Sequence, residues 1–97
     1  MSRSASKVYT AQSDIERLQR LVVELPSQAR VTITTEDGKI VSGTVTERPV
    51  VQQFDGPFGS HGVNGQVRLD EPDAPHWQAY IWLGDIRCVH RLLENHC

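Results

Sequence analysis

Apolar and polar residues alternate most clearly between residues 30 and 47. Val31 and Ile33 alternate with threonines, which is the period-two pattern of a half-buried β-strand. A three-residue loop after this strand places Ile33 opposite Val41 and Val31 opposite Gly43, and one face of the hairpin then stays apolar. A two-residue turn would mix the faces, so the sequence predicts the longer loop.

Glycines and aspartates mark the predicted turns. Asp37 and Gly38 suit a type I turn followed by a bulge, in which the glycine takes the left-handed conformation. Gly43 lies on the apolar face of the second strand, where a glycine indicates a sharp bend or a close backbone approach. Gly84 and Asp85 predict a tight connection into the last strand.

A helix over about residues 13–25 precedes the hairpin. Ser13 and Glu16 have the spacing of a capping box, and Pro26 ends the helix because the residue before a proline avoids helical geometry. The apolar residues of this segment fall on one side at helical spacing, which predicts packing over the sheet. A partner-binding helix is the alternative. We interpret residues 1–10 as a flexible tail and residues 11–97 as a single domain.

The second half of the chain predicts further strands. Prolines and glycines interrupt residues 48–65, which indicates a long mobile loop, with residues 50–54 either extending the second strand or forming a short extra one. Strands are expected at residues 66–70, 76–83 and 86 to about 92. In the middle one, Ile81 and Leu83 face inward, whereas Tyr80 and Trp82 face outward.

Composition limits the function classes. The 97 residues carry a net charge of −2, whereas a strongly nucleic-acid-binding monomer usually has a basic excess. The chain has no apolar run near the roughly 20 residues of a membrane span, and its start lacks the apolar region of a signal peptide. We therefore expect a cytoplasmic protein without a membrane partner. Cys88 and Cys97 are too few for a disulfide framework, and unpaired thiols are favoured over a structural pair.

Two motifs resemble those of Sm-like proteins, the small SH3-type barrels that assemble into rings on RNA. The first motif has the pattern V-x-I-x-x-x-D-G-x-x-x-x-G-x-V, matched by Val31, Ile33, Asp37, Gly38, Gly43 and Val45. The second motif is similar to residues 82–89, where Gly84, Asp85 and Val89 match. The resemblance implies a mainly β fold, with the helix followed by a five-stranded, strongly bent antiparallel barrel over about residues 30–93. It also points to a variant family of uncharacterised bacterial proteins.

The sequence departs from the family at the RNA-binding motifs. Leu83 stands at the position of the family's arginine, and the D-x-x-[MN]-N-like loop is not intact near Phe54. The resemblance therefore does not carry over the family's base-binding pocket. We expect a homo-oligomer, with a dimer favoured over a six- or seven-membered ring.

An outward aromatic face is the candidate binding surface. Arg68 is expected beside Tyr80 and Trp82, and stacking aromatics with an arginine suit single-stranded RNA. Packing under the helix or loop, or a subunit interface, is the alternative and is favoured for aromatics in general. Further candidates for RNA or partner contact are Phe54, Phe58 and Arg87.

No catalytic residues, metal site or cofactor are predicted. His61, His76, His90 and His96 with Cys97 match no usual zinc spacing, and Cys88 near His90 is more typical of a buried hydrophobic residue than of a nucleophile. The sequence thus predicts a non-catalytic Sm-like module that binds RNA. The alternative is a module for protein interaction or assembly that binds no RNA.

Overall fold

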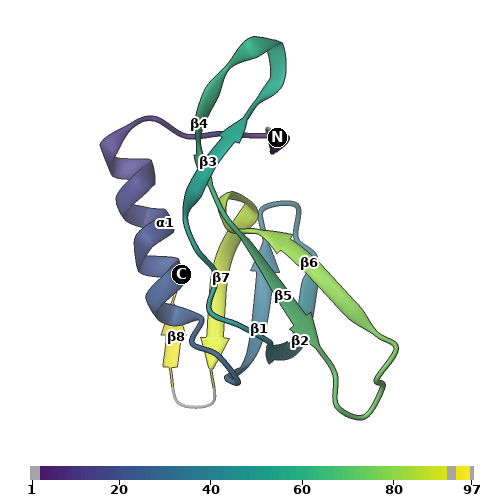
Figure 1. Ribbon diagram of the computed structural model, residues 1–97. Helices are drawn as coiled ribbons and strands as arrows, with labels where there is room; N and C mark the ends of the chain where they lie inside the picture. The colour runs from purple at the N-terminus through teal and green to yellow at the C-terminus, as the bar shows by residue number, and fades with distance from the viewer. Residues whose placement is uncertain (1–2, 92–93, 97) are drawn as a thin grey trace.

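The computed structural model describes residues 3–91 and 94–96 (Figure 1). One helix precedes a set of strands, joined in places by short 3₁₀ turns. In chain order the elements are α1 (Gln12–Glu24), β1 (Arg30–Thr35), β2 (Ile40–Val45), β3 (Gln52–Asp55), η1 (Pro57–Gly59), β4 (His61–Asn64), β5 (Gln66–Asp70), β6 (Gln78–Trp82), η2 (Leu83–Asp85), β7 (Ile86–Arg91) and β8 (Glu94–His96).

The first hairpin has the predicted register. Ile33 lies opposite Val41 and Val31 opposite Gly43, and Gly38 has a positive φ of 87°. A Cβ at Gly43 would lie 2.9 Å from the Leu69 Cβ and 3.0 Å from the Asp70 carbonyl oxygen, so β2 and β5 approach too closely there for any side chain. Pairing of β2 with β5 begins at the next residue. Gly43 therefore allows β2 to pair with both of its neighbours, β1 and β5.

The main sheet is antiparallel and open, with the strand order β6-β5-β2-β1-β7-β8. The predicted closure into a barrel is wrong, although the helix and the antiparallel strands are confirmed. Closure would require a second pairing partner for an edge strand such as β6. In the described residues β7 pairs instead with β1 on one edge and, through residues 89–91, with β8 on the other.

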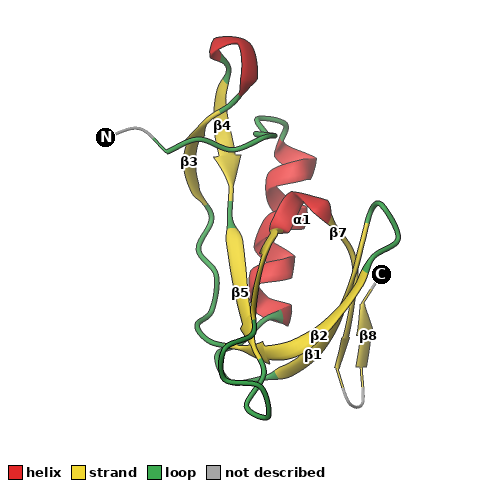
Figure 2. Cartoon of the chain, turned by 90° about the vertical axis from the view of Figure 1, so that its right-hand side faces the viewer, coloured by secondary structure: helices red, strands yellow, loops and turns green. Residues whose placement is uncertain are grey.

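The segment predicted as a long mobile loop is largely a hairpin. β3 and β4 pair with each other from Gln52 opposite Asn64 to Asp55 opposite His61, and they form a separate two-stranded sheet. This hairpin rises away from the main sheet and ends in the η1 turn (Figures 1 and 2). Within residues 48–65, the connection 48–51, the turn 56–60 and residue 65 lack strand structure, and β3 and β4 are strands in addition to the five predicted.

The N-terminal segment is placed against this hairpin, whereas the sequence predicted a flexible tail. Ser4 forms a bridge to Asp55 and Tyr9 forms a bridge to Val63, so both strands of the hairpin hold it. The backbone N–H of Tyr9 donates to the Val63 carbonyl, and the Val63 N–H donates back, both at 2.9 Å. Ala5 is buried as a result. These partners lie about fifty residues away in sequence, which local composition does not reveal.

Helix α1 packs against the concave side of the curved main sheet (Figure 2). Its cap differs from the prediction, because the N-cap is Ala11 and no side chain caps the helix, so Ser13 and Glu16 form no capping box. Among the described residues, no helix has the length and hydrophobicity that crossing a lipid bilayer requires. The core joins the helix to the sheet through Leu18, Leu21, Leu25, Val31, Ile33, Val45, Val67, Leu69, Ile81, Leu83, Ile86 and Val89.

Candidate functional site

The outer face of β5 and β6 brings the predicted arginine and tyrosine together. Arg68 lies directly opposite Tyr80 in the β5–β6 ladder. The side chains of such cross-strand pairs lie on the same face and within contact range of each other. Tyr80 is 55% exposed and Arg68 is also exposed, whereas Val67 and Ile81 between them point into the core. The predicted alternation along both strands is confirmed.

Trp82 extends this face toward the β3–β4 hairpin. Its ring meets the ring of Phe54 edge to face, with 5.1 Å between the ring centroids. Phe54 is buried, and Trp82 is half-buried, so the two rings support each other. Phe54 is therefore a packing residue and Trp82 is one in part, whereas Tyr80 keeps its ring accessible.

A groove of about 650 Å³ runs between this face, the N-terminal segment and the chain that connects β2 to β3. Its lining includes the three aromatic rings of Phe54, Tyr80 and Trp82. It also includes three arginines, Arg3, Arg48 and Arg68, and one carboxylate, Glu47. A chain with a net charge of −2 thus has a local excess of positive charge at this place.

The arginines of the groove differ in how they are held. Two bonds join Arg68 to Asp70, from Nε to Oδ1 at 3.0 Å and from Nη2 to Oδ2 at 3.4 Å. Arg3 Nη1 donates to the Gln52 side-chain oxygen at 2.5 Å. The guanidinium of Arg48 has no partner among the described residues, although its backbone N–H donates to Ser27 Oγ. Arg48 is therefore the group best placed to pair with an incoming anion.

Two of the predicted contact residues lie elsewhere. Phe58 is fully exposed at the tip of the β3–β4 hairpin, with a φ of 57° inside the η1 turn. Arg87 is exposed on β7, which β1, β2 and β5 separate from β6. The structure therefore unites Phe54, Arg68, Tyr80 and Trp82 in one groove and excludes these two.

The sequence analysis did not identify Arg3 and Arg48 as site residues. Arg3 belongs to the segment interpreted as a tail, and Arg48 to the segment interpreted as a loop. Arg3 reaches the groove because the N-terminal segment pairs with β3 through Ser4 and Asp55, and Arg48 lies in the connection between β2 and β3 that lines it. The only signal in the sequence was a basic residue at each of these places.

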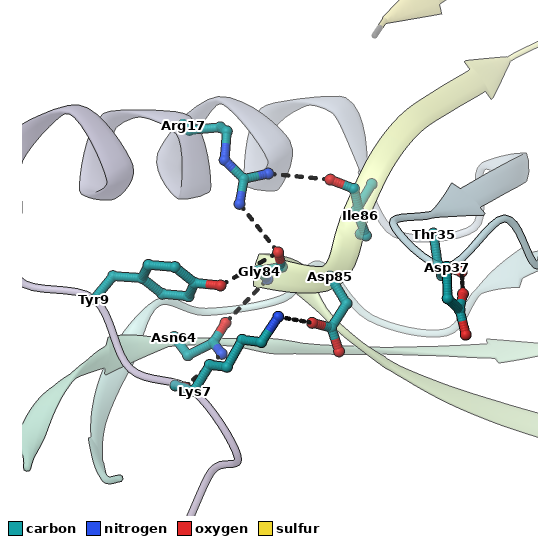
Figure 3. A network of polar contacts seen from close by, with 9 residues as sticks. All are labelled: Lys7, Tyr9, Arg17, Thr35, Asp37, Asn64, Gly84, Asp85 and Ile86. Atoms are coloured by element: carbon teal, nitrogen blue, oxygen red, sulfur yellow. Dashed lines mark hydrogen bonds and ion pairs between the residues drawn. The ribbon is translucent and has the colours of Figure 1, made fainter. Parts of the chain in front are cut away.

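The predicted turn residues form a polar network around η2 (Figure 3). Arg17 donates to the carbonyl oxygens of Ile86 at 3.0 Å and Gly84 at 3.1 Å. The Tyr9 hydroxyl donates to the same Gly84 oxygen at 3.3 Å, and a Cβ at Gly84 would lie 2.5 Å from the Tyr9 ring. Lys7 and Asp85 form an ion pair at 3.7 Å. These groups satisfy one another, so the network fixes the turn.

Asp37 has a similar structural role in the first hairpin. Its carboxylate accepts hydrogen bonds from the Thr35 hydroxyl and from the Lys39 backbone N–H. These bonds, that of Thr35 first, lower the pKa of Asp37 because they favour the ionised form. The carboxylate therefore stabilises the turn that Gly38 completes.

Histidines and cysteines were considered above as metal ligands or nucleophiles. Within residues 3–91 and 94–96, no group of three or more His, Cys, Asp or Glu side chains could hold a metal ion. Cys88 is disulfide-bonded, contrary to the expectation of free thiols, so it has no thiol to act beside His90. The other cysteine of the chain, Cys97, lies outside the described residues.

Comparisons with known proteins agree with this architecture. The family model described as "Domain of unknown function (DUF3247)" matches residues 2–92. A protein from Xanthomonas campestris, whose crystal structure is described as adopting a novel variant of the Sm-like motif, is 38% identical, with a TM-score of 0.88. The match covers 95% of this chain and 99% of that chain. No curated protein matches the sequence. The Sm-like resemblance predicted from the two motifs is confirmed.

Proposed function

Because the chain belongs to the family described as a domain of unknown function (DUF3247) and has a variant Sm-like fold, we propose that it is a non-catalytic module that binds single-stranded RNA. The proposed site is the groove beside β6. One observation carries the proposal: the exposed Tyr80 lies opposite Arg68 and two residues from Trp82 on the same strand, in a groove that Arg3 and Arg48 also line.

Single-stranded RNA offers what this groove can recognise. Its unpaired bases stack on aromatic rings, and its phosphates pair with guanidinium groups. Tyr80 supplies an accessible ring, while Trp82 is held in place by Phe54. Such a site has little sequence preference, because every base presents a flat π-face. The proposed role requires a location that contains RNA, which we take to be the cytoplasm.

The proposed site differs from the one that the Sm-like resemblance implies for RNA binding. The motif position of the family's arginine is Leu83, which is fully buried in the core. Leu83 cannot contact a ligand without unfolding part of the sheet. The groove on the outer face of β5 and β6 provides the aromatic and cationic groups instead.

Protein interaction is the second candidate, and the free edge of β6 favours it. β6 ends the strand order of the main sheet, and an unpaired strand edge can accept a strand from another chain. This function uses backbone groups at the edge, whereas RNA binding uses side chains on the outer face. The two candidates can therefore be separated by substitutions.

The test is binding of a short fluorescent oligouridine at low salt, measured by anisotropy. Tyr80→Ala should weaken binding by about 5- to 150-fold, the equivalent of about 1 to 3 kcal/mol for one stacked base. The matched control is Phe58→Ala, which removes an exposed aromatic outside the groove and should leave the affinity unchanged. Absence of binding by the wild-type chain, or equal affinity of the Tyr80→Ala chain, would exclude this function.

A further inference from the structure

The edge of β6 presents unpaired backbone groups at every second residue. The Leu83 N–H donates to the Gly65 carbonyl at 2.9 Å, so this pair is a hydrogen-bonded pair of the β5–β6 ladder. Such pairs alternate along antiparallel strands, and the N–H and C=O groups of Gln78, Tyr80 and Trp82 therefore point away from β5. Among the described residues, none of these outward groups has a hydrogen-bond partner.

The usual protections of an edge strand are missing from β6. Proteins block strand edges with charged side chains, prolines, bulges or a covering segment. The strand has the sequence QAYIW, without a charge or a proline, and its pairing with β5 has no register shift. It lies at the outer border of the sheet in Figure 1. This edge is therefore open to a further strand.

Space for that strand exists beside the edge. A groove of about 530 Å³ separates β6 from the first hairpin. Ala79, Ile81 and neighbouring residues of β6 line one side, and residues of the first hairpin, including Val41, line the other. Ser6, Lys7 and Asp85 also line this groove, and the described residues leave it open, so an extended segment can reach the backbone of β6.

We propose that β6 pairs with β6 of a second copy of the chain, antiparallel and around a two-fold axis at Tyr80. In this register Tyr80 faces Tyr80 of the other copy, and Gln78 faces Trp82. On the inner face, the small Ala79 lies opposite the large Ile81. The strand is thus complementary to itself: no charged residue of β6 faces another, and no two large residues face each other on the inner face.

Pairing of β6 does not depend on RNA binding. If the chain both dimerises and binds RNA, the dimer joins the two proposed RNA sites. Pairing around a two-fold axis perpendicular to the sheet keeps the outer faces of both copies on the same side. Tyr80 and Trp82 of one copy then lie beside the same two residues of the other copy on one continuous face. The two arginine-lined grooves form one longer surface across the dimer, which suits a longer RNA segment.

The test is the solution mass of the full chain by light scattering over a range of concentrations. The wild-type chain should dimerise. Tyr80→Lys and Tyr80→Glu should each be monomeric, because like charges would face each other across the axis. Mixing these two variants should restore a dimer of one chain of each kind, because opposite charges then face each other. Phe58→Lys, a matched exposed aromatic far from the axis, should remain a dimer.

Two results would overturn the proposal. One is a wild-type chain that stays monomeric at all concentrations. The other is a dimer that persists in the Tyr80→Lys chain, or single variants that do not recombine when mixed. Circular dichroism of each variant confirms that it is folded, and Gln78→Pro gives a second disruption. It removes one outward N–H that no described residue uses, and edge strands tolerate proline there.

Discussion

The side-chain oxygen of Asn64 accepts a hydrogen bond of 3.2 Å from the backbone N–H of Gly84, twenty residues further along the chain. The same oxygen accepts from the N–H of Gly65 at 2.8 Å, and the Asn64 side-chain nitrogen donates to the Lys7 carbonyl at 3.0 Å. Asn64 is 1% exposed. A single buried amide therefore joins the N-terminal segment, the end of β4 and the η2 turn.

Asn64→Ala should destabilise the protein strongly. Leaving a buried donor or acceptor without a partner costs about 1 to 3 kcal/mol per group, and this substitution affects three backbone groups. The free energy of unfolding from urea titration measures the effect. Gln66→Ala removes an exposed amide from β5 and should change stability by less than about 0.5 kcal/mol. Equal effects of the two substitutions would refute this role of Asn64.

Gly43→Ala should lower the free energy of unfolding by about 1 to 3 kcal/mol, the usual cost of overpacking a core. The new methyl group would lie 2.9 Å from the Leu69 Cβ and 3.2 Å from the Trp77 ring, so β2 and β5 would have to separate. Ser42→Ala, at the adjacent exposed position on the other face of β2, is the control. Thermal unfolding of both variants checks this prediction, and a neutral Gly43→Ala would contradict it.

Glu71→Gln should reduce the dependence of stability on pH in the acid range. Arg30 Nη2 lies 2.7 Å from Glu71 Oε2, and this hydrogen bond lowers the pKa of Glu71 in the folded protein. A lowered pKa contributes stability above the unfolded value of about 4.3, and this contribution is lost as the pH falls through the folded pKa. Urea titrations at several pH values should show wild type and Glu71→Gln converging in acid. Glu47→Gln, which removes an exposed carboxylate, should run parallel to wild type.

Arg48→Ala should make RNA binding less sensitive to salt. Each phosphate contact with a single strand contributes about −0.7 to the slope of log K against log salt. Arg48 has an unpartnered guanidinium in the groove, so its loss should make the slope shallower by about this amount. Arg87→Ala removes an exposed arginine from a distant strand and is the matched control. Equal slopes for the two variants would show that Arg48 does not contact phosphate.

The parts of the fold that depend on local pattern could be predicted from the sequence. The register of Ile33 with Val41 follows from keeping one face apolar, and the conformation of Gly38 follows from the loop length. The outward position of Tyr80 and its pairing with Arg68 follow from strict alternation along two strands. These features need only neighbours in sequence and one hairpin.

The parts that depend on distant partners could not be predicted. The β3–β4 hairpin was hidden by its glycines and by Pro57, which local rules assign to loops. The N-terminal segment has few apolar residues, but Ala5 becomes buried because the hairpin pairs with it. Of the arginines in the groove, Arg3 comes from the N-terminal segment and Arg48 from the connection that leads into the hairpin. These two arginines could therefore not be assigned to the candidate site until the long-range pairing was known.

The contact between Tyr9 and Gly84 has a consequence for how the chain reaches its final state. These residues are 75 positions apart, and the backbone partners of Tyr9 on β4 are also distant. During synthesis on a ribosome, the segment around Tyr9 emerges well before its partners Val63 and Gly84. Contacts at such separation form slowly because a large loop must close first. Residues 3–9, which are synthesised before their partners, are therefore expected to be among the last parts of this domain to dock.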